Sequence, residues 1–244
     1  MARKVRVLAL NSSPRKYGNT FKLLRVAIRA AEFEGGEVEL VHLYDYEIEP
    51  CIGCVSDLRE ACRYPCVVED GGRELIEKVY GSDAVIFATP IYWYGPPGHL
   101  KNLIDRLTCL ENMAFVEGRS WAEGKVAALI AAGGDSGNIS TIGYLMVVLN
   151  SMGFLIPPWA LAYYVGEGDP LERQESVSDA ANVGALVVRL AKLTRGIEDW
   201  YDPKLLDEIG GEKLIESVRR EADRVREEEL KERLKHIKKL LKGP

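Results

Sequence analysis

The fold is decided by residues 5–20, which read VRVLALNSSPRKYGNT. Residues 5–10 form a short apolar run that ends in a polar loop, a pattern typical of a buried strand. Between residues 21 and 31, apolar side chains recur at helical spacing, and the pair Gly35-Gly36 ends the pattern. The sequence therefore predicts a strand, a polar loop and a helix in succession.

The alternation of strands and helices continues to residue 193. Further strands are predicted at residues 37–43, 84–88, 125–131 and 154–165, the last interrupted by Pro157 and Pro158. Helical patterns follow them at residues 73–80, 100–109, 139–152 and 180–193. This repeat implies a parallel sheet with helices on both faces and a ligand site at the carboxyl ends of its strands. We expect an α/β fold with a doubly wound, five-stranded parallel sheet.

After Pro203 the composition changes to charged helix formers. Between Glu212 and Lys242 there are 11 basic and 8 acidic side chains, a net charge of +3, which leaves −8 for the rest of the chain. An imperfect apolar stripe is formed by Val218, Ala222, Val225, Leu230, Leu234, Ile237 and Leu241. We expect residues 1–198 to form the α/β domain. Residues 199–244 should add a charged helical extension that packs on its own subunit or on a symmetry mate.

Composition limits the classes of partner. The chain has 244 residues, is 47% hydrophobic and carries a formal net charge of −5. This gives no general electrostatic reason to expect nucleic-acid binding. No apolar run approaches the roughly 18 residues of a membrane span, and the N-terminus lacks the apolar region of a signal peptide. We expect a cytoplasmic protein that binds neither nucleic acid nor a membrane.

The first candidate site is the loop between the first strand and the first helix. Backbone N–H groups at a helix start, together with the positive end of the helix dipole, form a ready anion site. The side chains that would complete a phosphate cradle are Ser12, Ser13, Arg15, Asn19 and Thr20. The alternative is an ordinary loop in which Asn19 or Thr20 caps the helix. Neither common glycine-rich nucleotide motif is present, which argues against nucleotide hydrolysis and a standard dinucleotide fold.

Together with two later segments, this loop resembles the flavodoxin-like NAD(P)H-dependent FMN reductase superfamily, and within it the iron–sulfur flavoproteins. The resemblance spans residues 5–193. It is carried by residues 13–20 (SPRKYGNT), 89–95 (TPIYWYG) and 100–106 (LKNLIDR). It implies a flavodoxin-like fold in which the first loop, including Gly18, holds the phosphate of FMN.

The resemblance also places the second loop along the isoalloxazine ring of FMN. The candidate contacts there are Pro90, Ile91, Tyr92 and Trp93. Proline and aromatic side chains supply a flat apolar wall, while loop N–H groups can bond the polar edge of the ring. The alternative is that these aromatic residues serve packing or a subunit interface. A third turn, with Gly133 and Gly134, follows the fourth strand and would let the backbone approach the ring closely.

Four cysteines are clustered in the insertion at residues 44–70, namely Cys51, Cys54, Cys62 and Cys66. At this position the iron–sulfur flavoproteins carry a four-cysteine motif for a [4Fe–4S] cluster. The spacing departs from that motif, because Asp57 stands where the third cysteine is expected. A [4Fe–4S] cluster, zinc, and free thiols or disulfides all stay open as roles. Cys109 is expected to be a buried small side chain.

Three functional hypotheses follow. The leading one is an FMN-dependent oxidoreductase that passes electrons from NAD(P)H, a small-molecule donor, to an acceptor, with no side chain assigned as general acid or base. The second is an iron–sulfur electron carrier that receives electrons from a ferredoxin-like partner. The third is a scaffold or regulatory protein that kept the fold without the cofactor. The resemblance also implies a homodimer or homotetramer.

Overall fold

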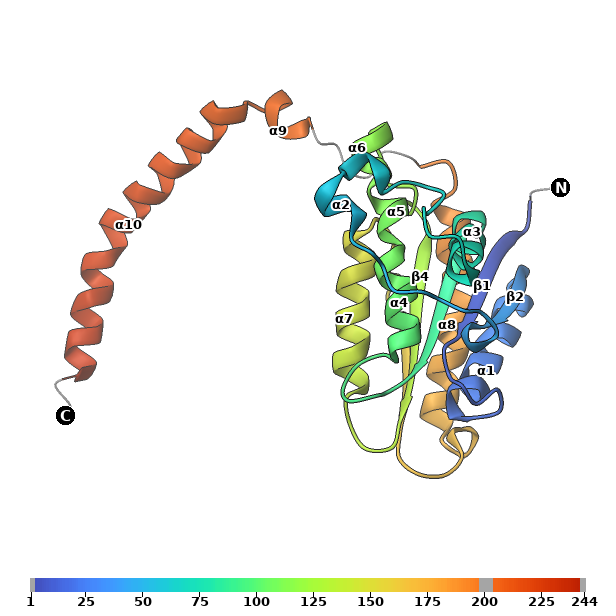
Figure 1. Cartoon of the computed structure of the whole chain (residues 1–244). Coiled ribbons are helices and arrows are strands. Elements are labelled where there is room, and N and C mark those ends of the chain that lie inside the picture. Colours follow the sequence, from blue (N-terminus) through green and yellow to red (C-terminus); the bar gives the residue numbers. More distant parts are fainter. Residues whose placement is uncertain (1–2, 198–203, 242–244) are drawn as a thin grey trace. The chain divides into compact units, whose positions relative to one another are not determined.

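A five-stranded parallel sheet forms the centre of the larger unit of the chain (Figure 1). The computed structural model describes residues 3–197 and 204–241, and the chain divides into two compact units, Met1–Trp200 and Tyr201–Pro244. The strands are β1 Val5–Asn11, β2 Gly36–His42, β3 Ala84–Pro90, β4 Val126–Gly133 and β5 Leu161–Val165. Their order is β2-β1-β3-β4-β5, and all neighbouring pairs are parallel. The predicted α/β fold with a five-stranded parallel sheet is confirmed.

The burial of each strand follows from its composition. β3 and β4 are almost wholly buried apolar runs, as expected of central strands with helices on both faces. The edge strand β2 alternates exposed glutamates with more buried apolar residues. The fifth strand begins later than predicted, because β5 starts at Leu161 while Leu155 forms only an isolated bridge with Val126. Pro157 and Pro158 carry no backbone N–H group, so they interrupt the strand pairing between Leu155 and Leu161.

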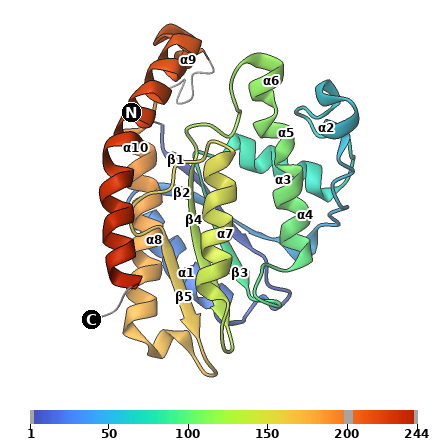
Figure 2. The ribbon, with the colours of Figure 1, turned by 90° about the vertical axis from the view of Figure 1, so that its left-hand side faces the viewer.

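Helices cover both faces of the sheet, as Figures 1 and 2 show. One face is packed by α1 Asn19–Phe33 and α8 Gln174–Leu193, and the other by α3 Gly71–Gly81, α4 Gly98–Arg106 and α7 Asn138–Ser151. The connections contain α2 Cys54–Asp57, α5 Thr108–Glu111, α6 Met113–Glu117 and the 3-10 turns Leu43–Asp45, Arg59–Ala61 and Pro170–Glu172.

Two helices differ most from their predicted bounds, whereas α3 and α7 differ from theirs by one or two residues at each end. The helix predicted at 100–109 is divided at Leu107 into α4 and α5. α8 begins at Gln174 rather than at residue 180, because its first turn is mostly polar and shows no apolar periodicity. Gly184 lets α8 approach α1 closely, since a Cβ atom there would lie 1.9 Å from the carbonyl oxygen of Ala27.

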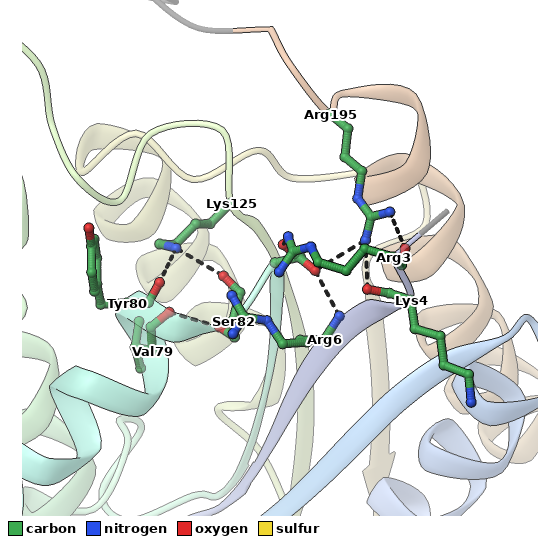
Figure 3. A network of polar contacts seen from close by, with 9 residues as sticks. Arg3, Lys4, Arg6, Val79, Tyr80, Ser82, Lys125 and Arg195 are labelled. Atoms are coloured by element: carbon green, nitrogen blue, oxygen red, sulfur yellow. Dashed lines mark hydrogen bonds and ion pairs between the residues drawn. The ribbon is translucent and has the colours of Figure 1, made fainter. Parts of the chain in front are cut away.

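Asp83 links three segments at the amino-terminal edge of the sheet. Its carboxylate accepts hydrogen bonds from the Arg3 guanidinium at 2.5 Å, the Arg6 backbone N–H at 2.8 Å and the Arg195 guanidinium at 3.3 Å. Figure 3 shows Arg3, Arg6 and Arg195 gathered in this network. Burial raises the pKa of Asp83, but the Arg6 N–H and the two arginines outweigh it and hold the pKa below its usual value.

Lys125 joins the start of β4 to the end of α3 in the same region (Figure 3). Its ammonium donates to the carbonyl oxygens of Tyr80 at 2.6 Å and Ser82 at 2.9 Å. Burial lowers the pKa of Lys125 to about 8. Lys125, Asp83 and their partners border a cavity of about 710 Å³. This cavity lies at the edge of the sheet opposite the predicted ligand site.

The smaller unit is helical, as predicted for the C-terminal extension. It contains α9 Leu205–Glu208 and the long α10 Gly211–Leu241, which carries the predicted apolar stripe. The start of the predicted extension, up to residue 203, lies outside the described residues. Across the two described segments, every helix is too short or too polar to span a lipid bilayer.

Candidate functional site

The loops after β1, β3, β4 and β5 meet at the carboxyl edge of the sheet and line one cavity of about 500 Å³. This volume is within the range of small-molecule sites. The predicted site residues that line it are Arg15, Gly18, Asn19, Thr20, Pro90, Ile91, Tyr92, Gly133 and Gly134. Among the described residues, Ser12, Ser13 and Trp93 are the predicted ones that do not line it. The structure thus brings all three predicted loops together.

The start of α1 opens on this cavity. Gly18 occupies the N-cap position in extended conformation, and within the described chain no side chain caps the helix. The predicted alternative, capping by Asn19 or Thr20, is therefore wrong. Asn19 instead donates its amide to the carbonyl oxygen of Gly168 at 3.0 Å. The N–H groups of the first turn stay available to an anion in the cavity.

Arg15 adds a positive charge at the cavity. Its guanidinium forms neither a hydrogen bond nor an ion pair with any residue in the described segments. Lys22 also lines the cavity, but its ammonium is paired with Asp169 at 2.6 Å. An unpartnered arginine beside an uncapped helix start suits an anionic group.

Ser12 and Ser13 hold the first loop in shape through hydrogen bonds within the protein. The buried Ser12 hydroxyl donates to the carbonyl oxygen of Ala88 at 2.8 Å and so ties the end of β1 to β3. The Ser13 hydroxyl accepts the backbone N–H of Arg15 at 3.2 Å. Both hydroxyls thus already have partners within the protein.

The second loop is a tight turn with unusual residues at its tip. Tyr92 and Gly95 exchange two backbone hydrogen bonds, of 2.9 and 3.2 Å. Trp93 and Tyr94 between them have φ values of 51° and 63°. Positive φ at both central positions is typical of a type I′ turn, which normally selects Asn or Gly. Tyr92 lines the cavity, while Trp93 at the tip of the turn is 95% exposed.

Glycines leave the cavity wall bare of side chains. A Cβ atom on Gly133 would lie 2.9 Å from Oδ1 of Asn138, whereas one on Gly134 would meet no atom of the described chain within 4 Å. Gly166 and Gly168, which the sequence analysis missed, line the cavity after β5 with φ values of 130° and 108°. The available signal was a glycine pair at the carboxyl end of a strand.

A second site unites all five cysteines of the chain. Cys51, Cys54, Cys62, Cys66 and Cys109 line one small cavity of about 10 Å³. The prediction that Cys109 is buried is correct, since it is 2% exposed. Its place beside the other four was missed, because α5 brings it there from far along the chain. All five are free thiols.

The cysteines differ in acidity. A hydrogen bond from Cys109, followed by one from the Val68 N–H and one from Arg106, lowers the pKa of Cys66 to about 5 against the effect of burial. Burial and the neighbouring Cys54 raise the pKa of Cys62 to about 12. The hydrogen bond to Cys66, with burial, raises the pKa of Cys109. Cys66 is thus the preferred thiolate.

A buried ion pair anchors this cysteine segment. The Arg106 side chain is wholly buried, and its Nη1 lies 2.5 Å from a carboxylate oxygen of Asp70. Its Nη2 donates to the Val68 carbonyl oxygen at 2.9 Å and to the Cys66 sulfur at 3.6 Å. Asp70 also accepts the backbone N–H groups of Glu49 and Arg73. The segment around Cys66 is therefore fixed to α3 and α4.

The donor set can be compared with the predicted metal roles. Within residues 3–197 and 204–241, no three His, Cys, Asp or Glu side chains converge as ligands of a single metal ion. A [4Fe–4S] cluster binds each cysteine to a different iron atom, so its thiolates need not converge on one point. Cysteine sulfurs around a shared cavity match the donor chemistry of such a cluster.

Strand order β2-β1-β3-β4-β5, with an uncapped helix start and glycine turns at the carboxyl edge, defines a flavodoxin-like flavoprotein. Residues 5–165 match the family model described as NADPH-dependent FMN reductase, and the chain belongs to this family. It is accordingly an FMN-binding oxidoreductase. This assignment favours the first hypothesis over a scaffold without cofactor.

Curated relatives carry two kinds of name. The chain is 29% identical over 204 residues to an iron–sulfur flavoprotein of Archaeoglobus fulgidus, covering 84% of this chain and 86% of the relative. It is 31% identical over 199 residues to an iron–sulfur flavoprotein of Methanocaldococcus jannaschii, covering 78% and 100%. It is also 30% identical over 183 residues to a putative NAD(P)H-dependent FMN-containing oxidoreductase of Bacillus subtilis, covering 73% and 96%.

Solved structures share the fold. RosB with the bound intermediate 8-demethyl-8-formylriboflavin-5′-phosphate has a TM-score of 0.70 at 22% identity, covering 86% of this chain and 87% of RosB. An NADH:FMN oxidoreductase has a TM-score of 0.57 at 20% identity, covering 80% and 93%.

Proposed function

We propose that the cavity at the carboxyl edge holds FMN with its phosphate at the start of α1, and that NAD(P)H is the electron donor. The observation that carries this proposal is the uncapped start of α1 with the unpartnered Arg15 beside it, in the same cavity as the second and third loops. An anion-binding end and an apolar wall in one cavity suit a molecule with a phosphate tail and a flat ring.

The residues of the first loop divide the work of holding the phosphate. First-turn N–H groups, the Arg15 guanidinium and the Thr20 hydroxyl donate to it, and Asn19 holds the Gly168 loop against it. Ser12 and Ser13 keep the loop in shape through their hydrogen bonds to Ala88 and Arg15.

The second and third loops hold the ring. Pro90, Ile91 and Tyr92 form an apolar wall, and the bare backbone at Gly133 and Gly134 allows close approach on the other side. Trp93 lies at the exposed rim, where it can contact a second substrate. When bound, FMN accepts hydride and passes on electrons, so the protein needs no general acid or base for this chemistry.

The test is FMN binding followed by reduction. The purified chain is titrated with FMN, and oxidation of NADH and of NADPH is then followed by absorbance under anaerobic conditions. Stoichiometric FMN binding with donor-dependent bleaching of the flavin supports the proposal. Binding without reduction by either donor would reject NAD(P)H and retain the cofactor.

A second candidate, an iron–sulfur electron carrier, is favoured by the cysteine site. All five cysteines line one cavity, which Arg106 and Asp70 hold in place. We propose that Cys51, Cys54, Cys62 and Cys66 hold a [4Fe–4S] cluster that receives electrons from a ferredoxin-like protein. Iron and acid-labile sulfide assayed in anaerobically purified protein test this, with four of each per chain expected.

The assembly state and location also stay proposals. We propose a cytoplasmic homodimer or homotetramer. Exposed Trp93 and Tyr94 at the tip of the second loop support a contact between copies near the cavity. Light scattering of the purified chain, with and without FMN, measures the mass of the assembly.

A further inference from the structure

The cavity of about 710 Å³ at the amino-terminal edge of the sheet has no role in the functions proposed above. Asp83 and Lys125, which line it, immediately precede β3 and β4, whose carboxyl ends border the other large cavity. At about 3.3 Å per residue these strands are about 23–26 Å long, so the two cavities are separate sites. The volume is within the range of small-molecule sites.

The charge of this cavity is opposite in sign to that of the whole chain. Five basic and three acidic side chains line it, whereas the chain has a formal net charge of −5. The basic side chains are those of Arg3, Arg6, Arg119, Lys125 and Arg195. Figure 3 shows all of these except Arg119 gathered at the same edge of the sheet. The cavity therefore favours an anionic ligand.

The four cations in Figure 3 have few anionic partners. Asp83 accepts hydrogen bonds from the guanidinium groups of both Arg3 and Arg195. Lys125 donates to two backbone carbonyl oxygens rather than to a carboxylate. The Arg6 guanidinium has neither a hydrogen-bond nor an ion-pair partner in the segments that the structure describes. Asp83 is thus the one carboxylate that these four side chains bond within those segments, and an excess of positive charge is left for a ligand.

The cationic groups are held in place by the protein itself. The Arg195 guanidinium also donates to the backbone carbonyl oxygens of Arg3 and, at 2.8 Å, of Lys4. Burial lowers the pKa of Lys125 to about 8, so a bound anion would stabilise its charged form. Donors that are already fixed lose little conformational freedom when a ligand binds. The site is therefore organised for an anion before the anion arrives.

We propose that this cavity is a separate binding site for a small molecule that carries at least two negative charges on phosphate groups, held by Arg3, Arg6, Lys125 and Arg195. Phosphate oxygens accept several hydrogen bonds at once, from guanidinium forks and from an ammonium group, which suits this set of donors. Such a ligand bridges the segments that precede β1, β3 and β4 and the segment that follows α8. The inference does not depend on FMN, because the flavin is proposed for the opposite edge of the sheet.

The test is calorimetric titration of the full chain, saturated with FMN, with inorganic pyrophosphate at constant ionic strength. Wild type should bind one pyrophosphate per chain with a Kd below about 1 mM. Arg6→Gln should raise this Kd about tenfold, because a charge-assisted hydrogen bond is lost while no protein group loses a partner. Lys125→Met, which removes the ammonium, should weaken binding to a similar degree.

Two arginine variants outside this cavity are the matched controls. Arg29→Gln removes an exposed charge from α1, and Arg15→Gln removes a charge from the other cavity, so both should keep the wild-type Kd for pyrophosphate. If the chain binds no FMN, the comparison of Arg6→Gln with Arg15→Gln still separates the two cavities.

Three results would overturn the inference. Wild type without saturable binding would mean that the cavity takes no such anion. Equal weakening by Arg6→Gln and Arg29→Gln would mean diffuse attraction to surface charge. Weakening by Arg15→Gln, with Arg6→Gln unchanged, would place the pyrophosphate in the first loop.

Discussion

Replacing Arg15 with glutamine isolates the contribution of the phosphate to FMN binding. Charge-assisted hydrogen bonds contribute about 1.5–3 kcal/mol, so Arg15→Gln should raise the Kd for FMN by about 10- to 150-fold. The guanidinium has no hydrogen-bond or ion-pair partner in the described parts of the chain, so its loss orphans no protein group. The free energy of unfolding without FMN should therefore change by less than about 0.5 kcal/mol.

Riboflavin supplies the second arm of the experiment. Riboflavin carries the same ring without the phosphate. Because Arg15 is expected to contact only the phosphate, the Kd of Arg15→Gln for riboflavin should stay within about twofold of the wild-type value. Both ligands are titrated into cofactor-free protein, and quenching of flavin fluorescence reports binding. Arg29→Gln is the matched control, because Arg29 lies on α1, its side chain is 71% exposed, and its one ion-pair partner among the described residues is Glu32.

Two results would refute the reasoning. Equal weakening of FMN and riboflavin would mean that Arg15 supports the ring or the shape of the loop. Unchanged FMN affinity, with Arg29→Gln also unchanged, would mean that the phosphate is held elsewhere.

Three further predictions concern stability, measured by urea unfolding. Gly184→Ala should lower the free energy of unfolding by about 3 kcal/mol, because the added Cβ would lie 1.9 Å from a carbonyl oxygen of α1. Gly143→Ala is the control and should not destabilise the chain, because a Cβ atom there would meet no described atom within 4 Å. Asp70→Asn should lower the free energy of unfolding by about 3–5 kcal/mol, because it leaves the buried charge of Arg106 unpaired. A loss under about 1 kcal/mol would contradict the pairing of Asp70 with Arg106 as a stabilising interaction. Lys125 has a folded-state pKa of about 8, below its unfolded value, so the unfolded chain binds the extra proton. Wild type should therefore gain stability relative to Lys125→Met by up to about 1.4 kcal/mol per pH unit between a pH of about 8 and about 10, and a flat difference would rule this out.

The fold could be predicted because burial dictates its pattern. Central strands buried on both faces must be short apolar runs, and such runs are visible without any knowledge of contacts. The loops of the site were also predictable, since parallel strands place their carboxyl ends at one edge. Arg15 and Tyr92 line the cavity as that argument expects.

The parts that escaped prediction depend on contacts between distant segments. Ser12 looks like a phosphate ligand in the sequence, but only the pairing of β1 with β3 shows that its hydroxyl bonds Ala88. Trp93 is turned to solvent by the positive φ of a type I′ turn, which its aromatic sequence does not suggest. Cys109 reaches Cys66 through the packing of α5, although 43 residues separate the two in the sequence.

The segment 100–106, which contributed to the family resemblance, acquires a physical role in α4. The helix begins just after the second loop and ends at Arg106 beside the cysteine site, a length of about 13 Å at 1.5 Å per residue. Along it, His99 bonds the carbonyl oxygens of Leu43 and Tyr46, and Asn102 donates to that of Ile48 at 2.9 Å. Figure 1 shows the start of the cysteine-rich segment running beside α4 toward α2. α4 thus holds the cysteine segment along the length of the helix and fixes the distance of that segment from the second loop, so changes in α4 should affect both sites together.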